Sequence, residues 1–597
     1  MPPLSALKLF DYLPTLFQFP NLPGIPLEFD GFLDSVKGLE NRRNQMQPAI
    51  DGLIRTYTID GNTKPAKDFL FGESPDRFRT GLSQLADSAA GGNSGMLLQM
   101  FLSNVLTMQP ETSKLTQLSL DSVDQFSMTL TNFQDTFQDA QESLPSWEAT
   151  LTDPESATKA FWPTLAEHAL AYNFLFLEKI GTSVTARLKT IFGADWNPQW
   201  ETHITSQRLY CIDLNIFTLY PAASVDKHLR FTPGTVTLLK QDPTTLELTP
   251  IAVRVADYNE ANKRVFEFGQ VSDSHWLYAL SAAKTSATVC GIWLGHVYHW
   301  HIVTAAVLKG MMNQLPLSHG IAKLLRPQSD YLMQFNEILL LTWKFIAPPT
   351  SFDTSDSFLK LMNDFAVGRN FFDDDPEVTL KRNGIRREDF SFANDWDRYP
   401  IVPRFLRIYE ICSEYVDVVV DTSYKTNQKV KDDQALGDWI KEARQKGKGN
   451  IKSLTRPTTK TGLKRLLTSL IYRVTMHGCS RMRSSLSPVL SWVGNYPVCL
   501  QRKDIPKPGE QINLLKYLPK TGTLGLMIRF YGIFIFSEPY ESLLPVGGDD
   551  TDLYFSTNTQ DPRNQALVRY RQNIRQFIGD LQATPVQPGQ WPRGIET

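Results

Sequence analysis

The stretch from Trp276 to Asn336 constrains this chain more than any other. It follows a long apolar pattern compatible with a helix, and three of the nine histidines, His296, His299 and His301, fall within six residues of it. An imidazole in an apolar helix is a hydrogen-bonded core residue, a ligand or a catalyst. The stretch therefore predicts one or two long buried helices that carry a candidate site.

The composition excludes several classes of protein. Of the 597 residues, 42% are hydrophobic and 21% are charged, which is typical of globular proteins. The formal net charge of -2 provides no overall field for nucleic acid, so we expect no nucleic-acid partner. The five cysteines are scattered and form no CxxC pair. They indicate reduced thiols rather than a disulfide framework or a zinc site.

The N-terminal segment suggests no targeting signal. Residues 1–25 contain no basic region followed by an apolar one, and no apolar run of about 18 residues predicts a membrane-spanning helix. We therefore expect a cytoplasmic protein. Residues 1–25 are rich in Pro, Phe and Leu. They either pack on the protein's own surface or make peripheral contact with a membrane.

The remaining pattern is mainly helical, with one small β element. Between residues 205 and 275, three segments are strand-like, and the run Asp242-Pro243-Thr244-Thr245 after the first of them is a turn signal. Pro163 is expected in the first turn of a helix that continues to Leu177. The strand-like segments are 236–239, 251–255 and 265–268, and the later helices are expected at 397–421, 432–445, 463–482 and 563–581.

The order of these features resembles the catalytic domain of the lipoxygenases, the non-haem iron dioxygenases of polyunsaturated fatty acids. Leu246-Glu247-Leu248-Thr249-Pro250-Ile251-Ala252 is similar to the family's Leu-x-Pro-Ile-Ala strand. Trp276-Leu277-Tyr278-Ala279 is similar to the Trp-Leu-Leu-Ala-Lys that opens its iron-binding helix. Further runs resemble the family at Leu324-Leu325-Arg326-Pro327-Gln328 and Asp433-Gln434-Ala435-Leu436-Gly437.

This resemblance implies a mainly α fold, a lipoxygenase-like large helical domain with a small β element. It covers residues 186–597, which we predict to form the catalytic domain. Residues 1–185 are predicted to form an N-terminal arm and a helical extension. The family's N-terminal β-sandwich lipid module is not evident there.

The resemblance also implies a site on two helices. The family has His-x4-His on the first helix, where a π-type widening brings residues five apart to one face. His296 and His301 have this spacing. In the ungapped register from Trp276, however, the family's first ligand falls on Gly291 and its second on His296. His301 falls on a family histidine that is not a ligand.

The second helix keeps one of its two family ligands. His477 falls on the third ligand position, but Arg481 replaces the usual Asn at the fourth. A guanidinium has no lone pair for a metal. Thr597 supplies a C-terminal carboxylate at the fifth position. His296, His477 and Thr597 therefore remain as potential metal ligands.

Because two ligands are lost, one of them to a cation, we favour a metal-free enzyme without a cofactor. Its substrate would be a long, apolar, unsaturated molecule of fatty-acid or polyene type, changed by cyclisation or isomerisation. In this interpretation His296, His301 or His477 is the acid or base. Arg481 is a cationic stabiliser and pairs with the Thr597 carboxylate.

Two alternatives stay open. The first is a non-haem Fe(II) dioxygenase of polyunsaturated fatty acids that uses His296, His477 and the Thr597 carboxylate. The second is a non-catalytic lipid-binding protein in which the same histidines are hydrogen-bonded core residues. In the iron alternative, His299 or His301 is a candidate for a further ligand. We nevertheless favour His299 as a packing or surface residue and Cys290 as a buried inert thiol. A structural role is also assigned to His319.

Overall fold

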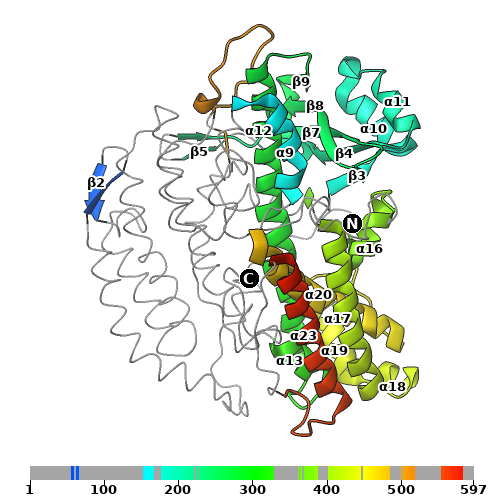
Figure 1. Cartoon of the computed structure of the whole chain (residues 1–597). Helices are drawn as coiled ribbons and strands as arrows, with labels where there is room; N and C mark the ends of the chain where they lie inside the picture. The colour runs from blue at the N-terminus through cyan, green and yellow to red at the C-terminus, as the bar shows by residue number, and fades with distance from the viewer. Residues whose placement is uncertain are drawn as a thin grey trace.

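The computed structural model describes fourteen parts of the chain, and they confirm the predicted fold class. They are 56–59, 62–65, 152–166, 176–220, 223–225, 228–327, 361, 364–365, 369–386, 401–445, 448–484, 499–500, 502–517 and 553–582. Within them the chain is mainly helical, and its largest sheet has five antiparallel strands. Figure 1 shows this sheet near one end of the molecule, with α12 running from it toward a group of helices.

The sheet has the order β3-β4-β7-β8-β9. At the predicted turn, Oδ1 of Asp242 accepts hydrogen bonds from the amides of Thr244 and Thr245, at 2.7 and 2.8 Å. A register shift at Leu238/Leu239 lies opposite Pro250, a residue that cannot donate to the ladder. The strands are β3 (Leu177–Lys179), β4 (Leu209–Leu214), β7 (Gly234–Gln241), β8 (Leu248–Ala256) and β9 (Lys263–Glu267).

Alternating side chains of the sheet enter two separate cores. Leu209 and Cys211 of β4 pack with α10 (Thr182–Phe192) and α11 (Trp200–Thr205). Tyr210 belongs to the large core that contains α12. This is the period of two that a strand requires when both of its faces are covered. Two further hairpins are described, β1 (Thr56–Ile59) with β2 (Asn62–Pro65) and β5 (Ala223–Val225) with β6 (His228–Arg230).

Helix α9 (Pro154–Ala166) corrects one prediction, because it begins at Pro154 and not at Pro163. Asp153 accepts hydrogen bonds from the Glu155 amide and the Ser156 hydroxyl at 3.1 and 2.5 Å, which supports the start at Pro154. The expected continuation to Leu177 is also wrong, since Leu177 opens β3. The division of the chain near residue 185 stays a prediction, although α9 packs on α12.

The stretch that begins at Trp276 forms a central column of three helical segments. They are α12 (Asp273–Cys290), η7 (Gly291–Thr304) and α13 (Ala305–Gln314), and η7 is a π-helix. Every residue of α12 from His275 onward is buried. A helix that is buried all round lies in the centre of a large domain. Figure 1 shows this column running from the sheet at the top down alongside the later helices to α13.

The later helices pack around the lower part of this column. α17 contacts both α20 and α23, and α19 contacts α13. Nε1 of Trp439 on α19 donates to the carbonyl of Val307 on α13 at 2.8 Å. None of the helices in the described ranges is long and apolar enough to cross a membrane. These helices are α16 (Pro376–Arg382), α17 (Ile401–Ser423), α18 (Asn427–Asp432), α19 (Gln434–Arg444), α20 (Lys460–Ser484) and α23 (Pro562–Gln582).

Candidate functional site

The π-helix η7 carries the first half of the predicted site. Gly291 opens it, is buried and has helical dihedral angles of φ -58° and ψ -45°. In a π-helix, residues five apart are one turn apart, so positions 291, 296 and 301 follow one another along one side. The hydroxyl of Thr304 donates to the carbonyl of His299, also five residues earlier, at 2.8 Å. The expected π-type widening is therefore confirmed.

Helix α20 carries the second half and contacts η7. Positions 473, 477 and 481 are spaced by four residues within its unbroken α-helical run, and this spacing places them on one face. The structure thus brings together the two helices that bear the predicted site. The side chains of His296, His301, His477 and Arg481 lie outside the described part, as does Thr597. Their roles stay predictions.

Buried charges between η7 and α20 centre on the carboxylate of Asp374. Its Oδ2 lies 2.5 Å from Nδ1 of His299 on η7 and 3.7 Å from Nη2 of Arg473 on α20. Its Oδ1 lies 3.5 Å from Nη1 of Arg369. We call these four residues the Asp374 cluster. One carboxylate thus contacts both helices of the predicted site.

The ionisation of the cluster follows from burial and from its cations. Burial alone would raise the pKa of Asp374, but His299, Arg473 and Arg369 together hold this pKa well below its ordinary value. The carboxylate is therefore ionised. Burial lowers the pKa of His299 more than Asp374 raises it, so the imidazole is neutral. Nδ1 then carries the hydrogen that points to Asp374, and Nε2 carries the lone pair.

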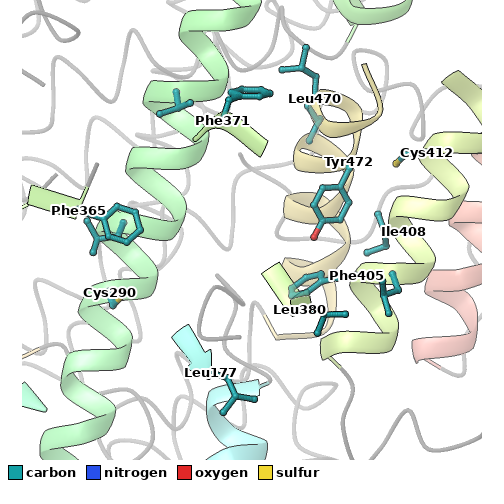
Figure 2. Close-up of a cluster of buried hydrophobic side chains, with 14 of the residues drawn as sticks. Leu177, Cys290, Phe365, Phe371, Leu380, Phe405, Ile408, Cys412, Leu470 and Tyr472 are labelled. Carbon is teal, nitrogen blue, oxygen red and sulfur yellow. The ribbon is translucent and has the colours of Figure 1, made fainter. Parts of the chain in front are cut away.

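Aromatic rings complete the surroundings of the two arginines. The guanidinium of Arg473 lies 4.2 Å from the ring centroid of Phe371 and also donates to the Phe371 carbonyl. The guanidinium of Arg369 lies 3.9 Å from the centroid of Phe365. Figure 2 shows Phe371 between the helix that carries Cys290 and α20. These cation–π contacts help to offset the cost of burying the guanidinium groups.

Sequence reasoning missed this cluster. Of the two interpretations of His299, packing or surface, the structure supports packing, because the side chain is buried, but its contact with a carboxylate is not among the predictions. The cluster can be recognised only from the fold, because His299 and Arg473 are far in sequence from the segment that carries Arg369 and Asp374. One signal is present in the sequence: Arg473 precedes His477 by one helical turn and is the single charged residue between positions 466 and 476.

Two other expectations concern His319 and Cys290. Nε2 of His319 lies 2.9 Å from Oδ2 of Asp433, and Nδ1 of His319 accepts the Ile321 amide at 3.1 Å. These contacts fit the structural role expected for His319. Cys290 is buried, and burial raises the pKa of its thiol. A protonated buried thiol fits the prediction of an inert side chain.

In the predicted register, the donor set at the family's iron positions does not match a five-ligand centre. Gly291 lies in the expected π-helix but offers no side-chain donor, and Arg481, in α20, offers a cation. Within the ranges that the structure describes, no group of three or more His, Cys, Asp or Glu side chains is arranged to hold a metal ion. The side chains of His296 and His477, and all of Thr597, lie outside those ranges.

Similarity to known sequences points to one class of enzyme. No family model matches the chain. It is 24% identical, over 309 residues, to the polyunsaturated fatty acid lipoxygenase ALOX15B of Rattus norvegicus, a match that covers 50% of this chain and 43% of that protein. It is 23% identical over 449 residues to ALOX12 of Homo sapiens, covering 71% of this chain and 64% of that protein. The chain thus spans under half the length of the first relative.

Solved structures share the fold at low sequence identity. A fungal lipoxygenase from Fusarium graminearum superposes with a TM-score of 0.61 and 14% identity, covering 98% of this chain and 99% of that chain. A calcium-dependent 11R-lipoxygenase gives a TM-score of 0.56 and 14% identity, covering 78% and 72%. The fold, which includes the π-helix, is that of the lipoxygenases. The curated relatives and the solved structures together support a lipoxygenase-like domain in this chain.

Proposed function

We propose that this chain is a lipoxygenase-like enzyme that converts a long, apolar, unsaturated, fatty-acid-like substrate without the family's complete iron centre. The reaction is a cyclisation or isomerisation by acid–base catalysis. The observation that carries the proposal is Gly291 at the start of η7, one π-turn before His296. The widened helix that serves the family's ligand pair is kept, while the first ligand is missing.

The substrate class is inferred from the relatives. Both mammalian relatives are named polyunsaturated fatty acid lipoxygenases. A polyene needs no added oxidant to isomerise, because one proton leaves a carbon and another is delivered to a different carbon of the same system. An imidazole can do both steps. We assign these steps to His296, His301 or His477, with Arg481 stabilising negative charge as it develops.

A second candidate is an Fe(II) dioxygenase that uses the donors left at the family positions. His296, His477 and the Thr597 carboxylate would form a 2-His-1-carboxylate set, which suits non-haem iron. The names of the relatives favour this candidate. Arg481 argues against the dioxygenase, because a positively charged guanidinium repels a metal cation bound close by.

Metal content and oxygen uptake separate these candidates. The full chain is purified, its iron and manganese are measured, and it is incubated with a panel of polyunsaturated fatty acids with and without oxygen. We expect sub-stoichiometric metal, no oxygen uptake and products with the mass of the substrate. Stoichiometric iron together with products heavier by two oxygen atoms would overturn the proposal in favour of the dioxygenase.

The variant His477→Ala tests catalysis against simple binding. We expect it to lower turnover about a hundred-fold, which is the usual contribution of a general acid or base, while the affinity for the fatty acid changes little. Fatty-acid binding by a wild-type protein that yields no product under any condition would instead support the non-catalytic lipid-binding alternative.

A further inference from the structure

The Asp374 cluster joins the two site helices from a firmly held segment. η8 (Phe371–Asp374) is closed by a capping box, in which the amide of Asn370 donates to Oδ2 of Asp373 at 2.9 Å. The amide of Phe371 donates to the hydroxyl of Ser453 at 2.9 Å. On the other side, the hydroxyl of Thr379 in α16 donates to the carbonyl of Asp373 at 2.8 Å. The Asp374 carboxylate therefore projects from a fixed support.

The contacts of Asp374 fall close to the predicted site on each helix. On η7 it contacts His299, three residues after His296. On α20 it contacts Arg473, one α-helical turn before His477. Because positions four apart share a helix face, the contact at Arg473 restrains the face on which position 477 lies.

The π-helix has a particular need for such a restraint. π-helical hydrogen bonding is rare and is found mainly as single turns within α-helices, whereas η7 spans 14 residues. His299 is held at two points, since its ring contacts Asp374 and its carbonyl accepts the Thr304 hydroxyl. A carboxylate that fixes an imidazole ring also fixes the backbone that carries it.

We propose that Asp374 is a positioning residue of the proposed site. It fixes the ring orientation of His299 and thereby the rotation of η7, and through Arg473 it fixes the rotation of α20, without touching the substrate. This inference rests on the proposed function, because the relation of the two helices affects turnover only if their side chains perform the chemistry.

The test compares two neighbouring carboxylates in the full chain. Asp374→Asn removes the charge and keeps the shape of the side chain. The matched control is Asp375→Asn, because the Asp375 carboxylate is also buried, but its described contacts are with Ser469 and Arg465, both on α20, at 2.5 and 3.9 Å. Conversion of a polyunsaturated fatty acid is measured for both variants.

We expect Asp374→Asn to lower kcat by about ten- to a hundred-fold, the usual effect of a misplacement of about 1 Å, and to leave KM within about two-fold. Asp375→Asn should change neither value by more than about two-fold. Equal losses of kcat in the two variants, or no loss in Asp374→Asn, would overturn the proposal.

Substitutions at His299 keep the test decisive if Asp374→Asn does not fold. His299→Asn presents an amide N–H close to the place of Nδ1, so that the link to Asp374 is kept. His299→Leu removes the donor. We expect the Asn variant to retain kcat within about three-fold and the Leu variant to lose about ten-fold or more. The same kcat in both would overturn the proposal.

Hydrogen exchange separates failure of this inference from failure of the proposed function. If the wild-type protein converts no fatty acid, the proposed function fails, and exchange of the amides in η7 then decides the positioning role. Faster exchange in Asp374→Asn than in Asp375→Asn supports it. Equal exchange in the two variants overturns it.

Discussion

The carboxylate of Asp433 provides the most quantitative prediction. Its Oδ2 accepts hydrogen bonds from the Tyr424 hydroxyl at 2.6 Å and from Nε2 of His319 at 2.9 Å, while its Oδ1 accepts the Leu436 amide at 3.0 Å. The last contact caps α19. Burial alone would raise the pKa of Asp433, but these hydrogen bonds hold it at about 2, below the ordinary value of 3.8. The prediction concerns Asp433→Asn, which keeps a capping oxygen and removes the charge.

The size of the effect follows from the pKa. A carboxylate whose pKa is lowered from 3.8 to about 2 stabilises the folded state by about 2 kcal/mol once it is ionised in both states. Because the folded pKa is the lower one, this stability is fully present above pH 3.8 and is lost as the pH falls through about 2. At pH 7, Asp433→Asn should therefore weaken the start of α19 by about 2 kcal/mol, which corresponds to about thirty-fold faster local exchange.

Hydrogen–deuterium exchange of the peptides that cover α19 measures this directly. At pH 7 we expect about thirty-fold faster exchange in Asp433→Asn, and we expect the difference from the wild type to shrink between pH 4 and pH 2. Asp438→Asn on the same helix is the control, since Asp438 is half-buried and accepts only from Gln434 within the described contacts, at 3.0 Å. Exchange of α19 within about three-fold of the wild type at pH 7 would refute the reasoning.

Two further predictions concern packing and a helix–helix contact. Gly449→Ala would bring a Cβ to 2.4 Å from the carbonyl oxygen of Ala443. We expect the free energy of unfolding, measured by urea denaturation, to fall by about 1 to 3 kcal/mol. The control is Gly181→Ala, which should cost far less because nothing lies within 4 Å of its Cβ. Trp276→Phe removes the bond from Nε1 to the Thr158 hydroxyl, 2.7 Å long, and should cost about 1 kcal/mol by the same assay. Thr158→Val also removes the bond from this hydroxyl to the Pro154 carbonyl, so it should cost less in the Trp276→Phe background than in the wild type, and additive losses would contradict a direct bond.

The parts of the fold that were predictable are those set by local sequence. The apolar pattern after Trp276 predicted the central column, and Asp242 predicted the turn between β7 and β8. β4 was missed because Leu209–Leu214 is buried almost throughout and shows no alternation of polar and apolar residues. The start of α9 was misplaced because Pro163 was interpreted as a first-turn residue, when Asp153 and Pro154 already provide that signal.

The predicted site and the Asp374 cluster differ in the information that is needed to predict them. The positions 291, 296 and 301 could be related by spacing alone, because a single helix carries them. The partners of Asp374 are far less regularly spaced. His299 lies 75 residues before it, Arg369 lies 5 residues before it, and Arg473 lies 99 residues after it. No periodicity links such segments. Their meeting depends on η8 lying between η7 and α20, which is a property of the tertiary packing.

The charges on α20 lead to the last prediction, which concerns Arg481. Arg473 and Arg481 lie four residues on either side of His477, on one face of the helix. Asp374 provides an anion for Arg473. In the metal-free proposal, Arg481 takes the carboxylate of Thr597 as its anion. In the iron alternative, that same carboxylate is a ligand, and a cation beside it weakens metal binding.

The two candidates therefore predict opposite effects for Arg481→Asn, which restores the amide usual in the family. If the metal-free proposal is correct, this variant loses about ten- to a hundred-fold in turnover, because a cationic stabiliser is removed, and iron does not recover it. If iron is used, the variant binds Fe(II) more tightly and its oxygen uptake rises. Iron affinity by titration and product mass, measured on the same preparations, distinguish these results. Increased oxygen uptake in Arg481→Asn would refute the argument that Arg481 serves a metal-free reaction.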